Sequence, residues 1–365
     1  MFSRDKPLPP AVLSPQTQAV TPHVFDRGID LGNGAYWNPE ALPNAHIVAI
    51  GASGSGKTQT LKAIAYELRR TYPQVQVILI DFHGDQALRG EQCYPMHMAS
   101  PHGINPLVIN LDPEGGGPNL QAIIVAAILK KAIQLGPNQE GLLLEVLADC
   151  YQRRGIDQAD QQTWQQCPPH FGDVQTHLQK REDEGCKDSA KLRLKLGATF
   201  QYGIFSREQP DLSAPLIRID LSKLPPPLQA VAAESLANQL INNHRLLGEI
   251  EGRLPRTVLF IDEAKEMPRM SGNACDRIIA DGRKYGLALV LASQSERHLS
   301  LDIIGNSATK MVLPVDQTEV RKVARKFRFT ENRIAQLQSL QALCRFGTQA
   351  ELVQVHPYYK RVEVG

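Results

Sequence analysis

The stretch Gly51-Ala52-Ser53-Gly54-Ser55-Gly56-Lys57-Thr58 decides the fold of this chain. It matches the pattern G-x-x-x-x-G-K-[ST], and it lies between an apolar run, residues 46–50, and an amphipathic segment, residues 57–72. A strand that enters such a loop and a helix that leaves it present successive backbone N–H groups to phosphate oxygens. We therefore predict that Lys57 reaches the β- and γ-phosphates of a nucleotide, and that the Thr58 hydroxyl binds the bridging Mg²⁺.

The expected ligands of this loop are ATP and Mg²⁺. Lys57 is also expected to be catalytic, so Lys57→Ala should abolish hydrolysis, while the bridging Mg²⁺ neutralises the charge that develops as the γ-phosphoryl group leaves. The residues expected to bind the nucleotide lie in the loop and in the first turn of the helix: Gly51, Ser53, Gly54, Ser55, Gly56, Lys57, Thr58 and Gln59.

A second apolar run, residues 257–261, is followed by two adjacent carboxylates. Asp262 is placed at the end of this strand, where it can hold Mg²⁺, and Glu263 is one residue further, where it can polarise the attacking water. An acidic pair after a strand is also a common helix cap. The phosphate-binding loop in the same chain favours the catalytic interpretation.

Two further residues are candidates for the reaction. Gln294 follows the apolar run 288–292, where it can sense the γ-phosphate or orient water. Arg283 lies in the segment 282–286 and is a candidate arginine finger that acts on the nucleotide of a neighbouring subunit. A solvated arginine at a helix end is the alternative interpretation of Arg283.

Strand and helix patterns divide the chain into four parts. Apolar runs alternate with helical segments before and after a region without strand signals, which predicts a mostly parallel sheet with helices on both faces. The fold class is therefore α/β, that of a RecA-like P-loop NTPase with an additional strand and a catalytic glutamate, interrupted by an all-α insertion. The expected parts are a proline-rich arm at 1–27, a first part of the core at 28–118, the insertion at 119–205 with helices at 121–134, 140–153, 171–184 and 188–200, and the rest of the core at 206–365.

Composition limits the possible partners and location. The 365 residues carry a formal net charge of +2, so any contact with DNA has to be local. The basic stretch 321–328 either touches a phosphate backbone or is a solvated helix face. The apolar run 122–129 is far shorter than the roughly 20 residues that span a bilayer, and residues 1–10 lack the apolar part of a secretory signal. We expect a cytoplasmic protein without a transmembrane segment.

Several short motifs, taken in their order along the chain, resemble the HerA/FtsK superfamily. Within it, the chain is similar to the HerA-like and the type IV secretion or conjugation ATPases over about residues 28–356. The resemblance implies a ring, usually a hexamer, with Gln294 sensing the γ-phosphate and Arg283 acting in trans. The motifs are Asp81-Phe82-His83-Gly84-Asp85, Asn105-Pro106-Leu107, Asp262-Glu263-Ala264, Gly282-Arg283-Lys284-Tyr285-Gly286 and Ala292-Ser293-Gln294. The chain departs from the family in showing neither an N-terminal β-barrel of the HerA type nor the transmembrane helices of membrane coupling proteins.

Three functions are compatible with these motifs. The first is a ring-shaped ATPase that moves DNA, with a nuclease as a candidate partner. The second is a cytoplasmic ATPase that energises secretion or conjugation-like transfer at a membrane complex. The third is an ATP-gated scaffold or switch, which the presence of both Glu263 and Gln294 disfavours. Stimulation of hydrolysis by DNA separates the first two.

Overall fold

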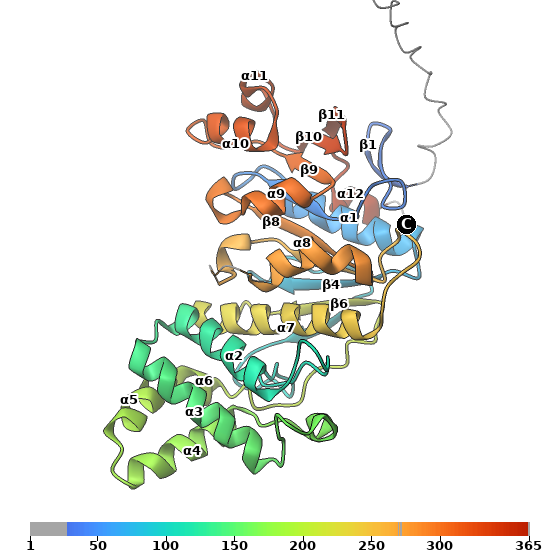
Figure 1. Cartoon of the computed structure of the whole chain (residues 1–365). Coiled ribbons are helices and arrows are strands. Elements are labelled where there is room, and N and C mark those ends of the chain that lie inside the picture. The colour runs from blue at the N-terminus through green and yellow to red at the C-terminus, as the bar shows by residue number, and fades with distance from the viewer. Residues whose placement is uncertain (1–27, 269, 271, 364–365) are drawn as a thin grey trace, which may run out of the picture.

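The computed structural model describes residues 28–268, 270 and 272–363, so the proline-rich arm at 1–27 lies outside the described residues. Its centre is a nine-stranded sheet in the order β11-β10-β9-β3-β8-β7-β4-β6-β5 (Figure 1). All neighbours from β9 to β5 pair in parallel, whereas β10 pairs antiparallel with β9 and β11. The predicted mostly parallel sheet is confirmed. The strands are β3 (Ile47–Ile50), β4 (Gln76–Asp81), β5 (Gln92–Pro95), β6 (Leu216–Asp220), β7 (Thr257–Ile261), β8 (Leu287–Ser293), β9 (Thr309–Val312), β10 (Gln341–Phe346) and β11 (Gln349–Gln354).

Helices cover both faces of this sheet, as predicted. Successive side chains of a strand point to opposite faces, so Ile47 and Ala49 pack with α1 (Lys57–Thr71). Val48 and Ile50 instead belong to the core that contains α7 (Pro226–Leu246) and α8 (Ala274–Tyr285). Every residue of β3 is buried, which explains why this strand has no polar alternation in its sequence.

Strand β8 lies between β3, which leads into the phosphate-binding loop, and β7, which leads into Asp262. The register pairs Ile50 with Ser293 and Ile261 with Leu291. Because all three strands are parallel, their carboxyl ends meet at one edge of the sheet. This order is the predicted additional-strand arrangement, and it brings three separate sequence motifs together.

Between β5 and β6 the chain forms five α-helices: α2 (Pro118–Ile133), α3 (Pro137–Arg153), α4 (Phe171–Asp183), α5 (Lys187–Lys195) and α6 (Gly197–Tyr202), with a 3-10 turn at Gln161–Gln165. The expectation of one helix over 188–200 is wrong. The backbone leaves the helical region at Leu196 (φ −84°, ψ 4°), directly before Gly197, whose lack of a side chain weakens a helix interior. Helix α2 packs on α7, and the helical segment shares a hydrophobic cluster with the sheet (Figure 1). The domain bounds at 118/119 and 205/206 stay a prediction.

The remaining short elements were not predicted, apart from α10: the sequence pattern predicts a helix over 317–327, and the observed helix begins three residues later, at Val320. A hairpin, β1 (Ile29–Gly32) and β2 (Ala35–Trp37), turns at Asn33 and Gly34, which both have positive φ (50° and 73°). The other elements are α9 (Leu301–Asn306), α10 (Val320–Phe327), α11 (Glu331–Ala335), α12 (Tyr358–Val362) and 3-10 turns at Ala264–Glu266 and Glu296–His298. Among the described residues, none of the helices has the length and apolarity that crossing a membrane requires.

Candidate nucleotide-binding site

The phosphate-binding loop is fixed at the carboxyl edge of the sheet by its own backbone. The amide of Gly51 donates to the carbonyl of Ser293, the last residue of β8 (3.1 Å), and the amide of Ala52 donates to the carbonyl of Pro314 after β9 (2.8 Å). Gly54 (φ 76°) and Gly56 (φ 93°) adopt left-handed backbone conformations, which side chains disfavour. The loop therefore depends on glycine at these two positions, and α1 starts directly after it at Lys57.

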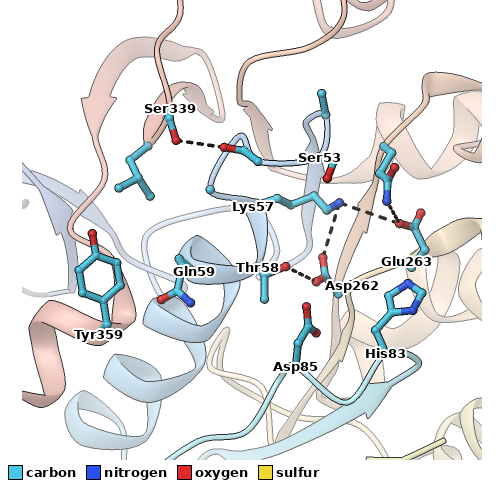
Figure 2. A pocket seen from close by; sticks show the side chains of 15 residues that line it. Ser53, Lys57, Thr58, Gln59, His83, Asp85, Asp262, Glu263, Ser339 and Tyr359 are labelled. Atoms are coloured by element: carbon cyan, nitrogen blue, oxygen red, sulfur yellow. Dashed lines mark hydrogen bonds and ion pairs between the residues drawn. The ribbon is translucent and has the colours of Figure 1, made fainter. Parts of the chain in front are cut away.

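A cavity of about 530 Å³ opens beside this loop (Figure 2). Most of the predicted residues line it: Ser53, Gly54, Gly56, Lys57, Thr58, Gln59, Asp262, Glu263 and Gln294. Gly51 and Ser55 do not line the cavity, although both belong to the loop. A Cβ added to Gly51 would lie 2.5 Å from Oγ of Ser55, so Gly51 is needed for close packing within the loop.

Five predicted side chains meet in this cavity. Oγ1 of Thr58 donates a hydrogen bond to Oδ2 of Asp262 (2.9 Å). Nζ of Lys57 lies 4.0 Å from Oδ1 of Asp262 and 4.0 Å from Oε2 of Glu263. Nε2 of Gln294 donates to the same Glu263 oxygen (2.8 Å). The additional strand β8 therefore brings Gln294 to Glu263, the residue that the sequence predicted to polarise the attacking water.

The oxygen atoms at this centre fit a hard divalent cation and its water shell. Oδ1 of Asp262 and Oε1 of Glu263 are buried and have no hydrogen-bond partner among the described residues. Burial raises the pKa of the Asp262 carboxyl, whereas the charge of Lys57 and the hydrogen bond from Thr58 act to lower it. A bound Mg²⁺ would stabilise the ionised carboxylate further, because Mg²⁺ takes one or two carboxylates together with substrate phosphates. The Thr58 hydroxyl and Asp262 are the residues that would hold it.

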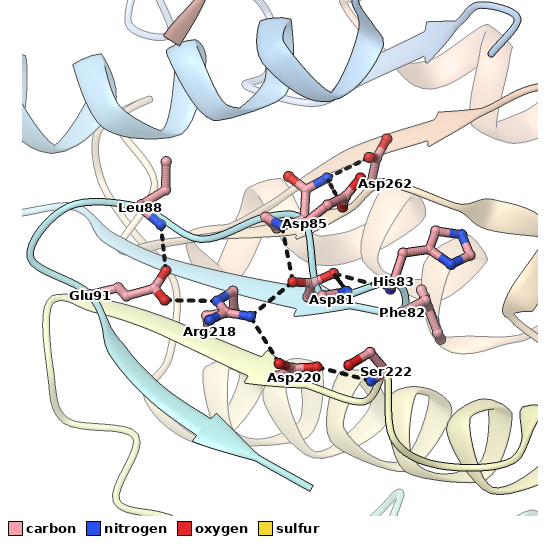
Figure 3. Close-up of polar contacts among 12 residues, drawn as sticks. Asp81, Phe82, His83, Asp85, Leu88, Glu91, Arg218, Asp220, Ser222 and Asp262 are labelled. Atoms are coloured by element: carbon pink, nitrogen blue, oxygen red, sulfur yellow. Dashed lines mark hydrogen bonds and ion pairs between the residues drawn. The ribbon is translucent and has the colours of Figure 1, made fainter. Parts of the chain in front are cut away.

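The sequence did not reveal that Gln86 contacts the predicted metal ligand. Nε2 of Gln86 donates to Oδ2 of Asp262 (2.5 Å) and to Oδ1 of Asp85 (3.3 Å), while its backbone amide donates to Oδ2 of Asp81 (3.0 Å) (Figure 3). Gln86 therefore connects the buried end of β4 to the predicted metal ligand Asp262. Its only sequence signal was its place just after the Asp81–Asp85 motif.

Asp81 itself is part of a buried charge cluster behind the site. It accepts backbone hydrogen bonds from His83 (3.1 Å) and Gly84 (2.7 Å), which shape the turn after β4. Its carboxylate also pairs with Nη1 of Arg218 (3.0 Å), and Arg218 pairs in addition with Glu91 (2.8 Å) and Asp220 (3.1 Å) (Figure 3). Asp81 thus has a structural role, whereas its neighbours His83 and Asp85 line the cavity.

Arg283 lies away from the cavity of its own chain. It is exposed in the last turn of α8, and β8 begins only a few residues later, at Leu287. Because β8 runs toward the site, its beginning lies at the opposite edge of the sheet. The Arg283 side chain forms no hydrogen bond or ion pair with the residues that the structure describes. A role on the nucleotide of a neighbouring subunit stays a prediction.

Three more cavity residues come from the C-terminal part of the chain. Ser339, Leu340 and Tyr359 line the cavity from segments that are far from the loop in sequence. No motif marks them, and no sequence pattern connects them with the site.

The parallel sheet with an additional strand, together with the loop between β3 and α1, defines the fold of a P-loop NTPase. Among solved structures, VirB4 of Thermoanaerobacter pseudethanolicus is similar to this chain with a TM-score of 0.74 and 18% identity, over 91% of this chain and 97% of that one. The plasmid coupling protein TrwB in complex with the ATP analogue ADPNP is similar with a TM-score of 0.62 and 14% identity, over 92% and 89%. TrwB in complex with ADP and Mg²⁺ has a TM-score of 0.61 at the same identity, over 90% and 89%. No family model and no curated protein sequence matches the chain. These likenesses confirm the predicted P-loop NTPase fold, which is the fold that the resemblance to the HerA/FtsK superfamily implied.

Proposed function

We propose that this chain is a Mg²⁺-dependent ATPase of the HerA/FtsK type. The observation that carries the proposal is the meeting of Lys57, the Thr58–Asp262 pair and the Glu263–Gln294 pair in one cavity beside a glycine-rich loop. The structures of TrwB with ADPNP and with ADP and Mg²⁺ support it, because they show nucleotides bound by a protein of this fold.

Each side chain has a separate part in the proposed hydrolysis. Bound Mg·ATP supplies the γ-phosphorus that water attacks and the ADP that leaves. Glu263 polarises that water and takes its proton through Oε1, while Gln294 holds the other carboxylate oxygen in place. Lys57, which is 8% exposed, balances the charge on the phosphates, and Asp262 with Thr58 holds the cation.

The motor function that we infer is translocation of DNA by a homo-oligomeric ring, most simply a hexamer. The basic stretch on α10 supports a local DNA contact. Val323 and Phe327 bury one side of this helix, and Lys322 pairs with Glu319. Arg321 and Arg325 are exposed and form no ion pair with the described residues, so they can meet phosphates.

A second candidate is a cytoplasmic ATPase that energises secretion or conjugation-like transfer. The specific observation in its favour is the fold shared with VirB4 and with TrwB, a conjugative coupling protein. The ATP-gated scaffold remains a third candidate, although the Gln294–Glu263 hydrogen bond argues for turnover.

The test is steady-state ATP hydrolysis with and without double-stranded DNA, at about 50 and 200 mM salt. Glu263→Gln serves as the inactive control, with an expected loss of about 10² to 10⁴-fold because the general base is removed. Strong, salt-sensitive stimulation supports the DNA motor. Unchanged turnover with DNA refutes it in favour of the transfer ATPase, and nucleotide binding without turnover in the wild type favours the scaffold.

A further inference from the structure

Leu340 has an unusual backbone conformation at the edge of the cavity. Its φ is 62°, in the left-handed region that residues with a side chain rarely adopt. Hydrogen bonds hold it there: its amide donates to the carbonyl of Ser55 (3.0 Å), and its carbonyl accepts from the amide of Val355 (2.8 Å). The Ser339 hydroxyl adds a bond to the carbonyl of Gly54 (3.1 Å). The start of β10 is therefore fastened to the phosphate-binding loop.

This attachment places the Leu340 side chain directly against the loop. A Cβ added to Gly56 would lie 2.5 Å from Cδ2 of Leu340, closer than a real contact. Leu340 thus forms an apolar wall next to the loop glycine that precedes Lys57. A strained residue that closes on a ligand loop is typical of functional sites.

Helix α12 brings a second apolar group to the same side of the loop. Its first residue, Tyr358, packs edge-on against Tyr66 of α1 (ring centroids 5.5 Å apart) and lies 5.0 Å from Nζ of Lys62. Arg361 pairs with Glu67 of α1 (3.3 Å). These contacts fix α12 on α1, so the position of the next residue, Tyr359, is well determined.

Tyr359 has no comparable structural partner. Its side chain is 47% exposed, lines the cavity and makes no hydrogen bond or ring contact within the described part of the chain. Figure 2 shows Tyr359 and Ser339 on one side of Lys57, with Asp262 and Glu263 on the other. Gln59, in the first turn of α1, also lines this side of the cavity, and its Oε1 is buried without a hydrogen-bond partner.

We propose that Leu340, Tyr359 and Gln59 form the subsite for the base of the nucleotide. The proposal rests on the proposed function, which places the γ-phosphate beside Glu263 and the other phosphates along the loop. The base of a nucleotide bound in this direction reaches the end of the cavity that Leu340 and Tyr359 line. An exposed aromatic ring and an apolar wall suit a planar base, since stacking on an aromatic side chain is favourable for every base. The Gln59 amide can both donate and accept, so we expect adenine and guanine to bind alike.

The experiment compares two ligands of the full chain, Mg·ATP and Mg·tripolyphosphate, which has the phosphates but no base. Affinities are measured by calorimetry or by competition. Loss of a stacking residue should weaken binding of ATP by about 5- to 150-fold. For Tyr359→Ala we expect this loss of affinity for ATP, while the affinity for tripolyphosphate stays within about twofold of the wild type. Tyr359→Phe keeps the aromatic ring and should restore ATP binding. Leu340→Gly, which suits the positive φ, should weaken ATP in the same selective way.

Tyr36→Ala is the matched control, because Tyr36 lines a different cavity, between β2 and β10. Equal losses for both ligands in Tyr359→Ala, or no loss for ATP, would overturn the base subsite while leaving the phosphate site intact. The proposed function fails separately: a wild type that binds neither ligand, or Lys57→Ala with both affinities unchanged, would overturn the nucleotide site and the base subsite with it.

Discussion

Replacing Gln86 by alanine tests how the metal site is oriented. Gln86 is 3% exposed, and its side-chain amide donates to Asp262 and Asp85. The substitution removes both hydrogen bonds, while the backbone bond from residue 86 to Asp81 can stay. A hydrogen bond to a charged group contributes about 1.5–3 kcal/mol, which corresponds to a factor of about 10 to 150. Partners that orient metal ligands typically change metal affinity by about 10- to 100-fold, so both arguments give the same range.

The measurement is ATP hydrolysis as a function of Mg²⁺ concentration at fixed ATP. We expect Gln86→Ala to raise the Mg²⁺ concentration at half-maximal rate by about 10- to 100-fold. Gln179→Ala is the matched control, because Gln179 also donates to an aspartate, Asp183 (2.8 Å), but on the exposed side of α4. A midpoint that moves by less than about twofold, or by the same factor in the control, would refute the orienting role of Gln86.

Three further predictions concern pH, DNA and the neighbouring subunit. Burial raises the pKa of Glu234 from 4.5 to about 7. Between these pH values the folded state therefore holds a proton that the unfolded state has lost. The free energy of unfolding should fall with rising pH by up to about 1.4 kcal/mol per pH unit and level off above about pH 7. Urea unfolding from pH 4.5 to 8 should show a flatter profile for Glu234→Gln, and an unchanged slope would contradict this. The double substitution Arg321→Ala/Arg325→Ala should lower the slope of log DNA affinity against log salt by about two. The control Lys191→Ala removes a surface lysine that is paired with Asp188 (3.0 Å), and it should leave this slope unchanged. Arg283→Ala should reduce hydrolysis by about 10³-fold or more while ATP still binds, and mixing with Lys57→Ala subunits should restore part of the rate; absence of rescue would count against a finger in trans.

Much of the core was predictable because its elements are long or strongly patterned. Residues 57–72 were expected to be helical, and residues 57–71 form α1; the fully buried run 257–261 forms β7. The misses are short elements whose stability comes from tertiary contacts. Strand β5 has four residues, of which only Tyr94 is buried, and α12 has five residues that depend on Tyr66 and Glu67 of α1. Single-sequence patterns carry little information about such segments.

The candidate site divides in the same way. Five residues of the site were recognisable because each belongs to a motif that follows an apolar strand. The structure brings all five to one cavity: Lys57, Thr58, Asp262, Glu263 and Gln294. The carboxyl ends of parallel strands meet at one edge of the sheet, so a polar residue that follows an apolar run can be assigned to this edge from the sequence.

What the sequence by itself determined is the phosphate-binding loop, since a strand, the six loop residues 51–56 and a helix are contiguous and their conformation is local. Only the tertiary structure decided that Gln86 reaches Asp262. The tertiary structure also brought Leu340 and Tyr359 to a loop almost 300 residues earlier in the chain. The physical reason is that these contacts depend on the packing of distant segments around one sheet, and no local propensity or spacing encodes which surface side chains that packing places together.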